Sequence, residues 1–147
     1  HHVASVSTYL NFQGNTEEAF TFYKSVFGTD FLGPVIRFKD VGFGTAPGMP
    51  ELSEAELNMI MHAELPILAG HVLMATDMIE SLGHHLRIGN NTTISLTVDS
   101  REEADRLYGL LGQDSTEFSP MAEMPWGQYW GTALDRFGVR WMFASPL

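Results

Sequence analysis

The chain contains no cysteine. Disulfide bonds, thiol nucleophiles and thiolate metal sites are therefore excluded. Because a chain without cysteine suits a reducing compartment, we expect a cytoplasmic protein.

Cations are scarce as well, with 8 Lys and Arg against 18 Asp and Glu and a formal net charge of -10. A surface of this charge repels nucleic-acid phosphates and anionic membranes, so we expect neither as a partner. Long apolar runs are also missing, since none approaches the roughly 20 residues that a membrane-spanning helix needs.

The 147 residues, 44% of them hydrophobic, are typical of one globular domain, which we place at residues 3–147. The chain begins His1-His2 without an initiator methionine, which resembles the remnant of a purification tag. We exclude both histidines from functional reasoning.

The chain contains an internal repeat, because Asn15–Ala19 and Ser100–Ala104 align at an offset of 85. Each segment begins with a residue that can cap a helix and places a glutamate three residues later, which is typical of a capping box. Gly28 and Gly112 are natural ends for the two helices. Capping and the helix dipole explain the paired acids of these segments, so we assign them no catalytic role.

One strand precedes each predicted helix and three strands follow it. In the first strand of each half, apolar residues alternate with polar ones, which predicts one face under the helix and one wet, concave face. A tight turn at Ala69-Gly70 joins two of the strands, and the unmatched segment Lys39–Glu56 is predicted to be a long loop. The sequence thus predicts an α+β fold of two βαβββ modules, residues 5–80 and 91–147, which form a cupped mixed sheet and are joined by a linker at 81–90. The predicted strands are 7–12, 31–38, 62–68 and 71–76 in the first half, and 93–98, 116–119, 129–134 and 139–144 in the second.

Several short motifs follow one another along almost the whole chain: Asn11-Phe12-Gln13-Gly14-Asn15, Val26-Phe27-Gly28, Met49-Pro50-Glu51-Leu52, Ile60-Met61-His62-Ala63, Trp130-Gly131, and Asp135-Arg136-Phe137-Gly138-Val139-Arg140-Trp141. In this order and spacing they resemble the PhnB-like branch of the vicinal oxygen chelate superfamily. That superfamily includes glyoxalase I, extradiol dioxygenases and bleomycin-resistance proteins. The resemblance implies a glyoxalase/bleomycin resistance-like fold around a small-molecule site, often in a two-fold homodimer.

The enzymes of this superfamily hold a metal ion at four points, on the first and last strand of each module. Carried over to this chain, the four points fall on Ser7, Met74, Thr93 and Met142. Divalent ions at such sites need His, Gln or Glu, and two hydroxyls with two thioethers are poor substitutes. We therefore predict no metal and no other cofactor.

The predicted ligand pocket combines the polar face of the first strands with residues of the last strands. Arg140 is expected to share this face and to receive an anionic ligand group. The aromatic residues near the end of the chain are explained equally well by a pocket wall or by core packing. The full predicted pocket is Ser7, Tyr9, Asn11, Met74, Thr93, Ser95, Trp126, Trp130, Arg140 and Met142.

Three other interpretations compete with this one. A metal-dependent lyase or dioxygenase would hold its metal at His62, Glu64 and His71, although polar residues that face solvent explain these positions better. A scaffold protein with a vestigial cup is the second. The third is a nucleotide-dependent methyltransferase, because Asp40–Gly44 resembles the glycine motif of those enzymes. That motif needs a helix directly after it, and the Pro-rich segment that follows here cannot begin one. We therefore interpret Asp40–Gly44 as part of a loop.

We conclude that the chain is a metal-independent small-molecule-binding protein whose ligand the sequence does not identify; whether it also catalyses a reaction stays open. We further expect a homodimer, because Met59, Ile60, Met61 and Met121 look like an exposed apolar surface. The alternative is that the loop Lys39–Glu56 folds back and covers them.

Overall fold

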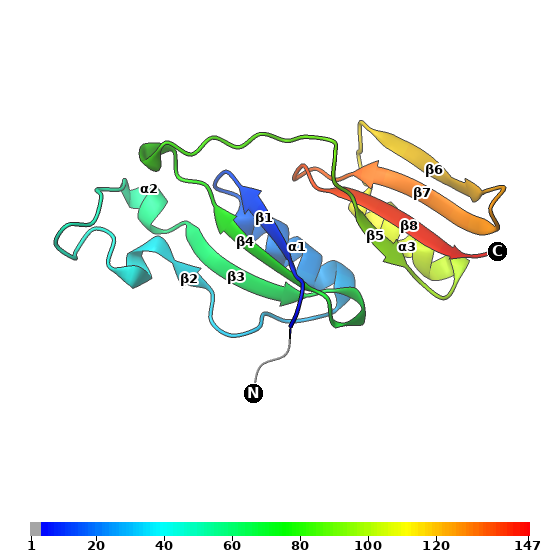
Figure 1. The fold of residues 1–147 in the computed structure, drawn as a ribbon, viewed down its shortest axis with the longest axis horizontal. Coiled ribbons are helices and arrows are strands. Elements are labelled where there is room, and N and C mark those ends of the chain that lie inside the picture. The colour runs from blue at the N-terminus through cyan, green and yellow to red at the C-terminus, as the bar shows by residue number, and fades with distance from the viewer. Residues whose placement is uncertain (1–3) are drawn as a thin grey trace. The chain divides into compact units, whose positions relative to one another are not determined.

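The computed structural model describes residues 4–147, so the predicted tag remnant His1-His2 lies outside the described residues. The chain divides into two compact units, one ending at Arg87 and one running from Ile88 to Leu147. Each unit contains its own four-stranded sheet (Figure 1). No helix among the described residues is long and apolar enough to cross a membrane.

The first unit has the strand order β1-β4-β3-β2. Strand β1 runs parallel to β4, and the other neighbours are antiparallel. Its elements are β1 (Thr8–Phe12), α1 (Thr16–Phe27), β2 (Ile36–Arg37), a short helix α2 (Glu54–Leu57), β3 (Ile60–Pro66) and β4 (Val72–Asp77).

The second unit repeats this topology in the order β5-β8-β7-β6, again with its first and last strands parallel. Both units are therefore βαβββ modules with mixed sheets, which confirms the predicted α+β fold. The elements are β5 (Ile94–Thr97), α3 (Arg101–Leu111), β6 (Phe118–Glu123), β7 (Gln128–Leu134) and β8 (Arg140–Pro146).

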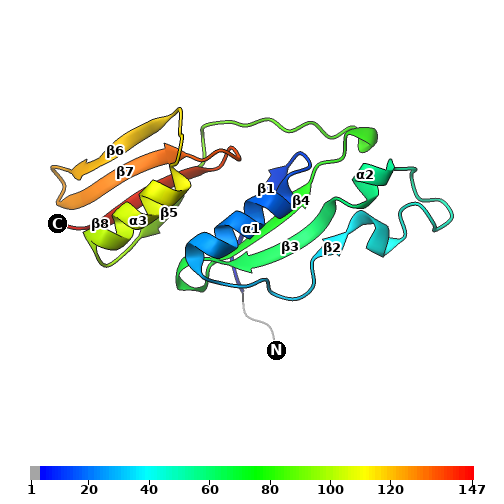
Figure 2. The same ribbon diagram turned by 180° about the vertical axis from the view of Figure 1, so that it is seen from behind.

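One helix covers one face of each sheet, as Figure 2 shows from behind. In the first unit Phe12 of β1 is buried and meets Phe20 of α1 edge to face, with 6.3 Å between the ring centroids. In the second, Phe143 of β8 meets Tyr108 of α3 at 5.5 Å. The predicted alternation is confirmed, because the residues between the apolar ones on β1 and β5 are exposed.

The two helices begin differently. At α3 the prediction is confirmed, since the Ser100 side chain accepts a hydrogen bond from the backbone N–H of Glu103. At α1 it is wrong, because the Asn15 side chain makes no capping hydrogen bond. The buried carboxylate of Asp77 accepts from the N–H groups of Gly14 and Thr16 and from the Thr16 hydroxyl instead.

The turn between β3 and β4 agrees with the predicted hairpin. Ala69 and Gly70 have φ values of 56° and 77°, and His71 donates its backbone N–H to the Leu68 carbonyl. Two successive left-handed residues are typical of the turn that matches the twist of paired strands.

Four predictions about the irregular segments need correction. Strand β2 is far shorter than the predicted 31–38, and β6 begins two residues later than predicted and extends further. The loop Lys39–Glu56 includes helical turns at both ends, of which Phe38–Val41 overlaps the supposed glycine motif. Ile60, expected to be exposed, is buried, whereas Met59, Met61 and Met121 are half-buried.

Candidate functional site

The first sheet has one face that α1 does not cover. Tyr9 of β1 lies opposite Met74 of β4, and Met74 lies opposite Glu64 of β3. Cross-strand neighbours project from the same side of a sheet, and Tyr9 is 50% exposed. Asn11 lies on the same face two residues along β1, and Ser7 precedes the strand.

A histidine and a glutamate meet on this face. The His62 Nε2 and Glu64 Oε2 atoms are 2.8 Å apart, and the Tyr9 ring lies 6.0 Å from the His62 ring, centroid to centroid. The preferred interpretation of the sequence was that these two side chains face solvent. Their spacing of two on a strand was the signal that they project together.

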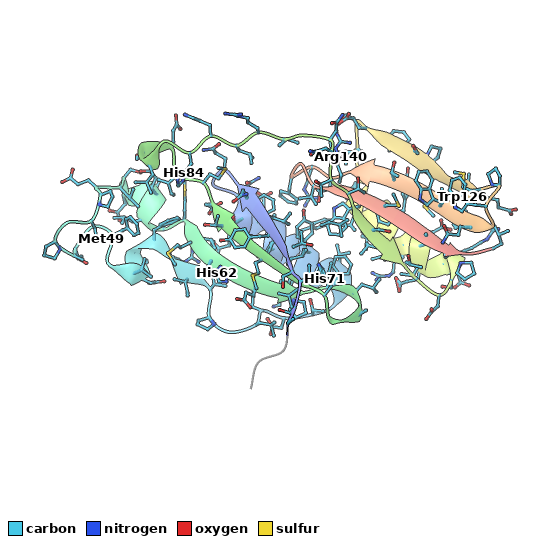
Figure 3. The ribbon with its side chains drawn as sticks, viewed as in Figure 1. Met49, His62, His71, His84, Trp126 and Arg140 are labelled. Carbon is cyan, nitrogen blue, oxygen red and sulfur yellow. The ribbon has the colours of Figure 1, made fainter. Side chains whose placement is uncertain are left out.

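His71 lies apart from this pair, as Figure 3 shows for the two labelled histidines. Its Nε2 atom is 2.8 Å from the Thr8 hydroxyl, and Thr8 belongs to the alternate side of β1 from Tyr9. Among residues 4–147 there is no group of three or more His, Asp or Glu residues arranged to hold a metal ion. The hypothesis of a metal at His62, Glu64 and His71 is therefore wrong in this structure.

The second sheet has an equivalent uncovered face. Ser95 of β5 lies opposite Met142 of β8, and Met142 lies opposite Thr132 of β7. The Ser95 hydroxyl donates to the Met142 sulfur at 3.7 Å. Thr93 directly precedes β5 and is exposed.

Arg140 lies two residues before Met142 on β8, as predicted, but its charge is already paired. Its guanidinium donates to the Glu117 carboxylate at 2.8 Å and to the Gly89 carbonyl at 3.0 Å. A bound anion would have to compete with Glu117 for this group. The predicted role of Arg140 as an anion acceptor stays a prediction.

The two predicted tryptophans lie together. Their rings meet edge to face with centroids 5.7 Å apart, and the Trp126 indole N–H donates to the Gln128 side chain. Trp126 is 60% exposed, whereas Trp130 is half-buried on the same side of β7 as Thr132. Neither ring belongs to the core beneath α3, where Trp141 is fully buried.

The superfamily's metal ion does not fit the residues at its expected points. The first unit offers the Ser7 hydroxyl and the Met74 thioether, and the second offers Thr93 and Met142. Neutral hydroxyls and thioethers bind borderline divalent ions far more weakly than imidazole or carboxylate. The Met142 sulfur also already accepts a hydrogen bond from Ser95.

Two hollows lie away from these faces. One of about 560 Å³ in the first unit has the two methionines Met59 and Met78 and the acids Glu56 and Glu80 in its wall. One of about 290 Å³ in the second unit is lined in part by Ile88, Asp114 and Arg136. None of the ten predicted pocket residues lines either hollow. That the two uncovered faces form one concavity stays a prediction.

Known proteins resemble this chain over nearly its full length, although no protein-family model matches it. Protein PA1353 from Pseudomonas aeruginosa is 30% identical, with a TM-score of 0.80 and 98% of both chains covered. A PhnB protein from Bacillus cereus is 24% identical, with a TM-score of 0.76, 97% of this chain covered and 99% of the other. A glyoxylase/bleomycin resistance protein/dioxygenase domain from Frankia sp. EAN1pec is 14% identical, with a TM-score of 0.63, 100% of this chain covered and 94% of the other.

The fold and the motifs lead to the same assignment as these similarities. The duplicated βαβββ topology is common to the two units, and the motifs that resemble the PhnB-like branch extend from Asn11 to Trp141. The chain belongs to the same family as protein PA1353, and its fold is that of the glyoxalase/bleomycin resistance-like proteins.

Proposed function

We propose that the protein binds a small organic molecule on the uncovered sheet faces without using a metal ion. The observation that supports this most directly is the composition of the faces. Each combines a thioether with an aromatic ring and hydrogen-bonding groups, namely Met74 with Tyr9 in the first unit and Met142 with Trp130 in the second. Small-molecule sites are typically built from apolar and aromatic surface with a few placed polar groups.

The charges favour a neutral or cationic ligand over a strongly anionic one. The chain has a formal net charge of -10, and Arg140 is paired with Glu117. An anion approaching the second face would meet repulsion before it reached a cation.

Tryptophan fluorescence tests this proposal. A panel of planar aromatic compounds is screened for quenching and for a raised melting temperature, which binding to the folded state produces. We expect a hit to lose about tenfold or more of its affinity in Trp130→Ala, since loss of a buried aromatic contact is worth roughly 1–3 kcal/mol.

Phe118→Ala is the matched control. Phe118 is an exposed aromatic residue of the same sheet, but it lies opposite Ala133, on the side that α3 covers. Equal losses in the two variants, or a panel in which nothing binds, would argue against the uncovered face as the site.

Metal content provides a second test. Elemental analysis of purified protein is expected to find well under one transition-metal ion per chain, because the hydroxyls and thioethers are poor ligands. Stoichiometric zinc or nickel would favour a metal-dependent lyase or dioxygenase instead.

We also propose a homodimer. Phe118 and Trp126 are large apolar side chains that lie more than half exposed on one unit, and a second copy would shield them. A stable dimer should bury at least about 1,000 Å² in total. Light scattering distinguishes a mass near 16.4 kDa for one chain from twice that value, and the lower mass would contradict the dimer.

A further inference from the structure

An irregularity in strand β3 directs His62 onto the uncovered face. In the pairing of β2 with β3, Ile36 lies opposite His62 and the next residue, Arg37, lies opposite Ile60, so Met61 is an extra residue on β3. Ile60 and Ala63 consequently both face α1, where they line one small pocket with Phe20. Bulges of this kind often redirect a side chain at a functional site.

Glu64 orients the imidazole ring of His62. The His62 Nε2 and Glu64 Oε2 atoms are 2.8 Å apart. Because an ionised carboxylate can only accept a hydrogen bond, the neutral ring carries its proton on Nε2 and its lone pair on Nδ1. Among residues 4–147 no hydrogen bond to Nδ1 is present. The ring therefore offers a proton acceptor, and a carboxylate behind it stabilises the cation that forms on proton transfer.

The surroundings of this pair suit a flat molecule. The Tyr9 ring lies beside His62, and the Met74 thioether lies between Tyr9 and Glu64 across the strands. Aromatic rings and thioethers both make favourable contacts with a planar ring. The side chains of His62 and Glu64 are 27% and 32% exposed, so a ligand can reach them while much of each is shielded from water.

We propose that His62 and Glu64 form a proton-accepting dyad that binds a planar ligand with a weakly acidic O–H group. The ligand's O–H bond breaks, its electron pair stays on oxygen, and the proton joins His62 Nδ1. The resulting imidazolium lies between the ligand oxyanion and the Glu64 carboxylate. A ligand that becomes ionised only at the site also avoids the repulsion that the acidic protein exerts on a permanent anion.

This proposal rests on the proposed function, because it names the class of ligand for the first uncovered face. The probe for it is 4-nitrophenol, a phenol whose ionised form absorbs visible light. Binding is measured by calorimetry and ionisation by absorbance at one pH. We expect the wild type to bind the probe and to raise its ionised fraction above that in buffer.

Two substitutions on the uncovered face and one on the other side of the sheet separate the contributions of His62 and Glu64 to ionisation of the probe. His62→Gln should lower the ratio of ionised to neutral bound probe roughly tenfold, which corresponds to about one pKa unit of lost stabilisation, and Glu64→Gln should lower this ratio by a smaller factor. His71→Gln is the matched control, because His71 contacts Thr8 on the other side of the sheet, and it should behave as the wild type.

The outcomes distinguish the dyad from the binding site. Binding without ionisation, or an ionised fraction unchanged in His62→Gln, would overturn the dyad and leave the proposed function standing. No binding by the wild type would overturn the ligand class and weaken the proposed function with it. The ¹⁵N chemical shifts of His62 in the free protein provide an independent measurement that needs no variant: a neutral ring protonated on Nδ1 instead of Nε2 would also overturn the dyad.

Discussion

The two units have the same strand order and differ in how a buried acidic residue stabilises each of them. In the first unit Asp77 ends β4, opposite Phe12 in the parallel pairing, and its carboxylate reaches Thr16 and Ile60, which are far away in the chain. In the second unit Asp135 accepts hydrogen bonds from Phe137 and Val139, which follow it within a few residues.

The equivalent of Asp77 in the second unit is Ser145, because Met74 and Met142 occupy equivalent positions in the parallel pairings and Asp77 and Ser145 each lie three positions further along the strand. Ser145 is fully buried, and its hydroxyl donates to the Pro146 carbonyl. With no carboxylate at that point, α3 depends on Ser100 for its cap. The comparison teaches that one topology tolerates a local or a long-range solution to the same problem of unpaired N–H groups at a helix start.

The largest effect on stability is expected at Asp77. Replacing it by Ala leaves the N–H groups of Gly14, Thr16 and Ile60 without their acceptor in a buried place, so we expect a loss of on the order of 3–5 kcal/mol in the free energy of unfolding. Urea denaturation measures it. Asp77→Asn, which keeps the shape, should lose less, and an unchanged midpoint in Asp77→Ala would contradict this account.

A smaller effect is expected where the units differ at the sheet. Gly131 of β7 occupies the position of Ala63 of β3, and a Cβ there would lie 2.9 Å from the Ser119 carbonyl oxygen. Gly131→Ala, which copies the first unit into the second, should destabilise the protein by about 1–3 kcal/mol. Gly109→Ala in α3, where a Cβ meets nothing within 4 Å, is the control and should stabilise by about 0.5–1 kcal/mol. Thermal unfolding of both variants compares them.

Acid should affect an interaction that has no counterpart among those described in the second unit. The backbone N–H of Ser53 and the Ser81 hydroxyl lower the pKa of Glu56 to about 2 from its ordinary 4.5. The stabilisation is therefore fully present above pH 4.5 and is lost as the pH falls through about 2. Urea midpoints of the wild type should fall across this range, and those of Glu56→Gln should fall less steeply. Parallel curves for the two proteins would exclude Glu56 as the cause.

The smallest expected effect is at the cap of the second helix. Ser100→Ala removes one hydrogen bond to the backbone N–H of Glu103 and should cost about 1 kcal/mol. Asn15→Ala is the matched variant of the first helix and should cost less, because Asn15 makes no capping bond. A larger loss of stability in Asn15→Ala than in Ser100→Ala, measured by urea titration, would contradict this difference between the two helices.

Much of the fold could be predicted because its signals are local. Alternation along β1 and β5 identified which residues face the helix, and the repeated helix starts revealed the duplication. The ends of strand β2 could not be predicted, because only two of its residues pair with β3 and the residues around them also favour a strand. The burial of Ile60 was missed because the extra residue Met61 shifts the alternation of β3, and such a bulge leaves little trace in one sequence.

The candidate site, like the fold, could be predicted only in part. The sequence by itself determined that Tyr9, Met74, Ser95 and Met142 lie on the faces their helices leave uncovered, because strand alternation depends only on neighbours in the chain. Only the tertiary structure decided that Glu117 pairs with Arg140, that Glu64 rather than His71 accompanies His62 beside Tyr9, and that Asp77 caps α1. Most of these contacts join residues many positions apart, and the packing of strands and helices, which no local pattern encodes, selects such partners.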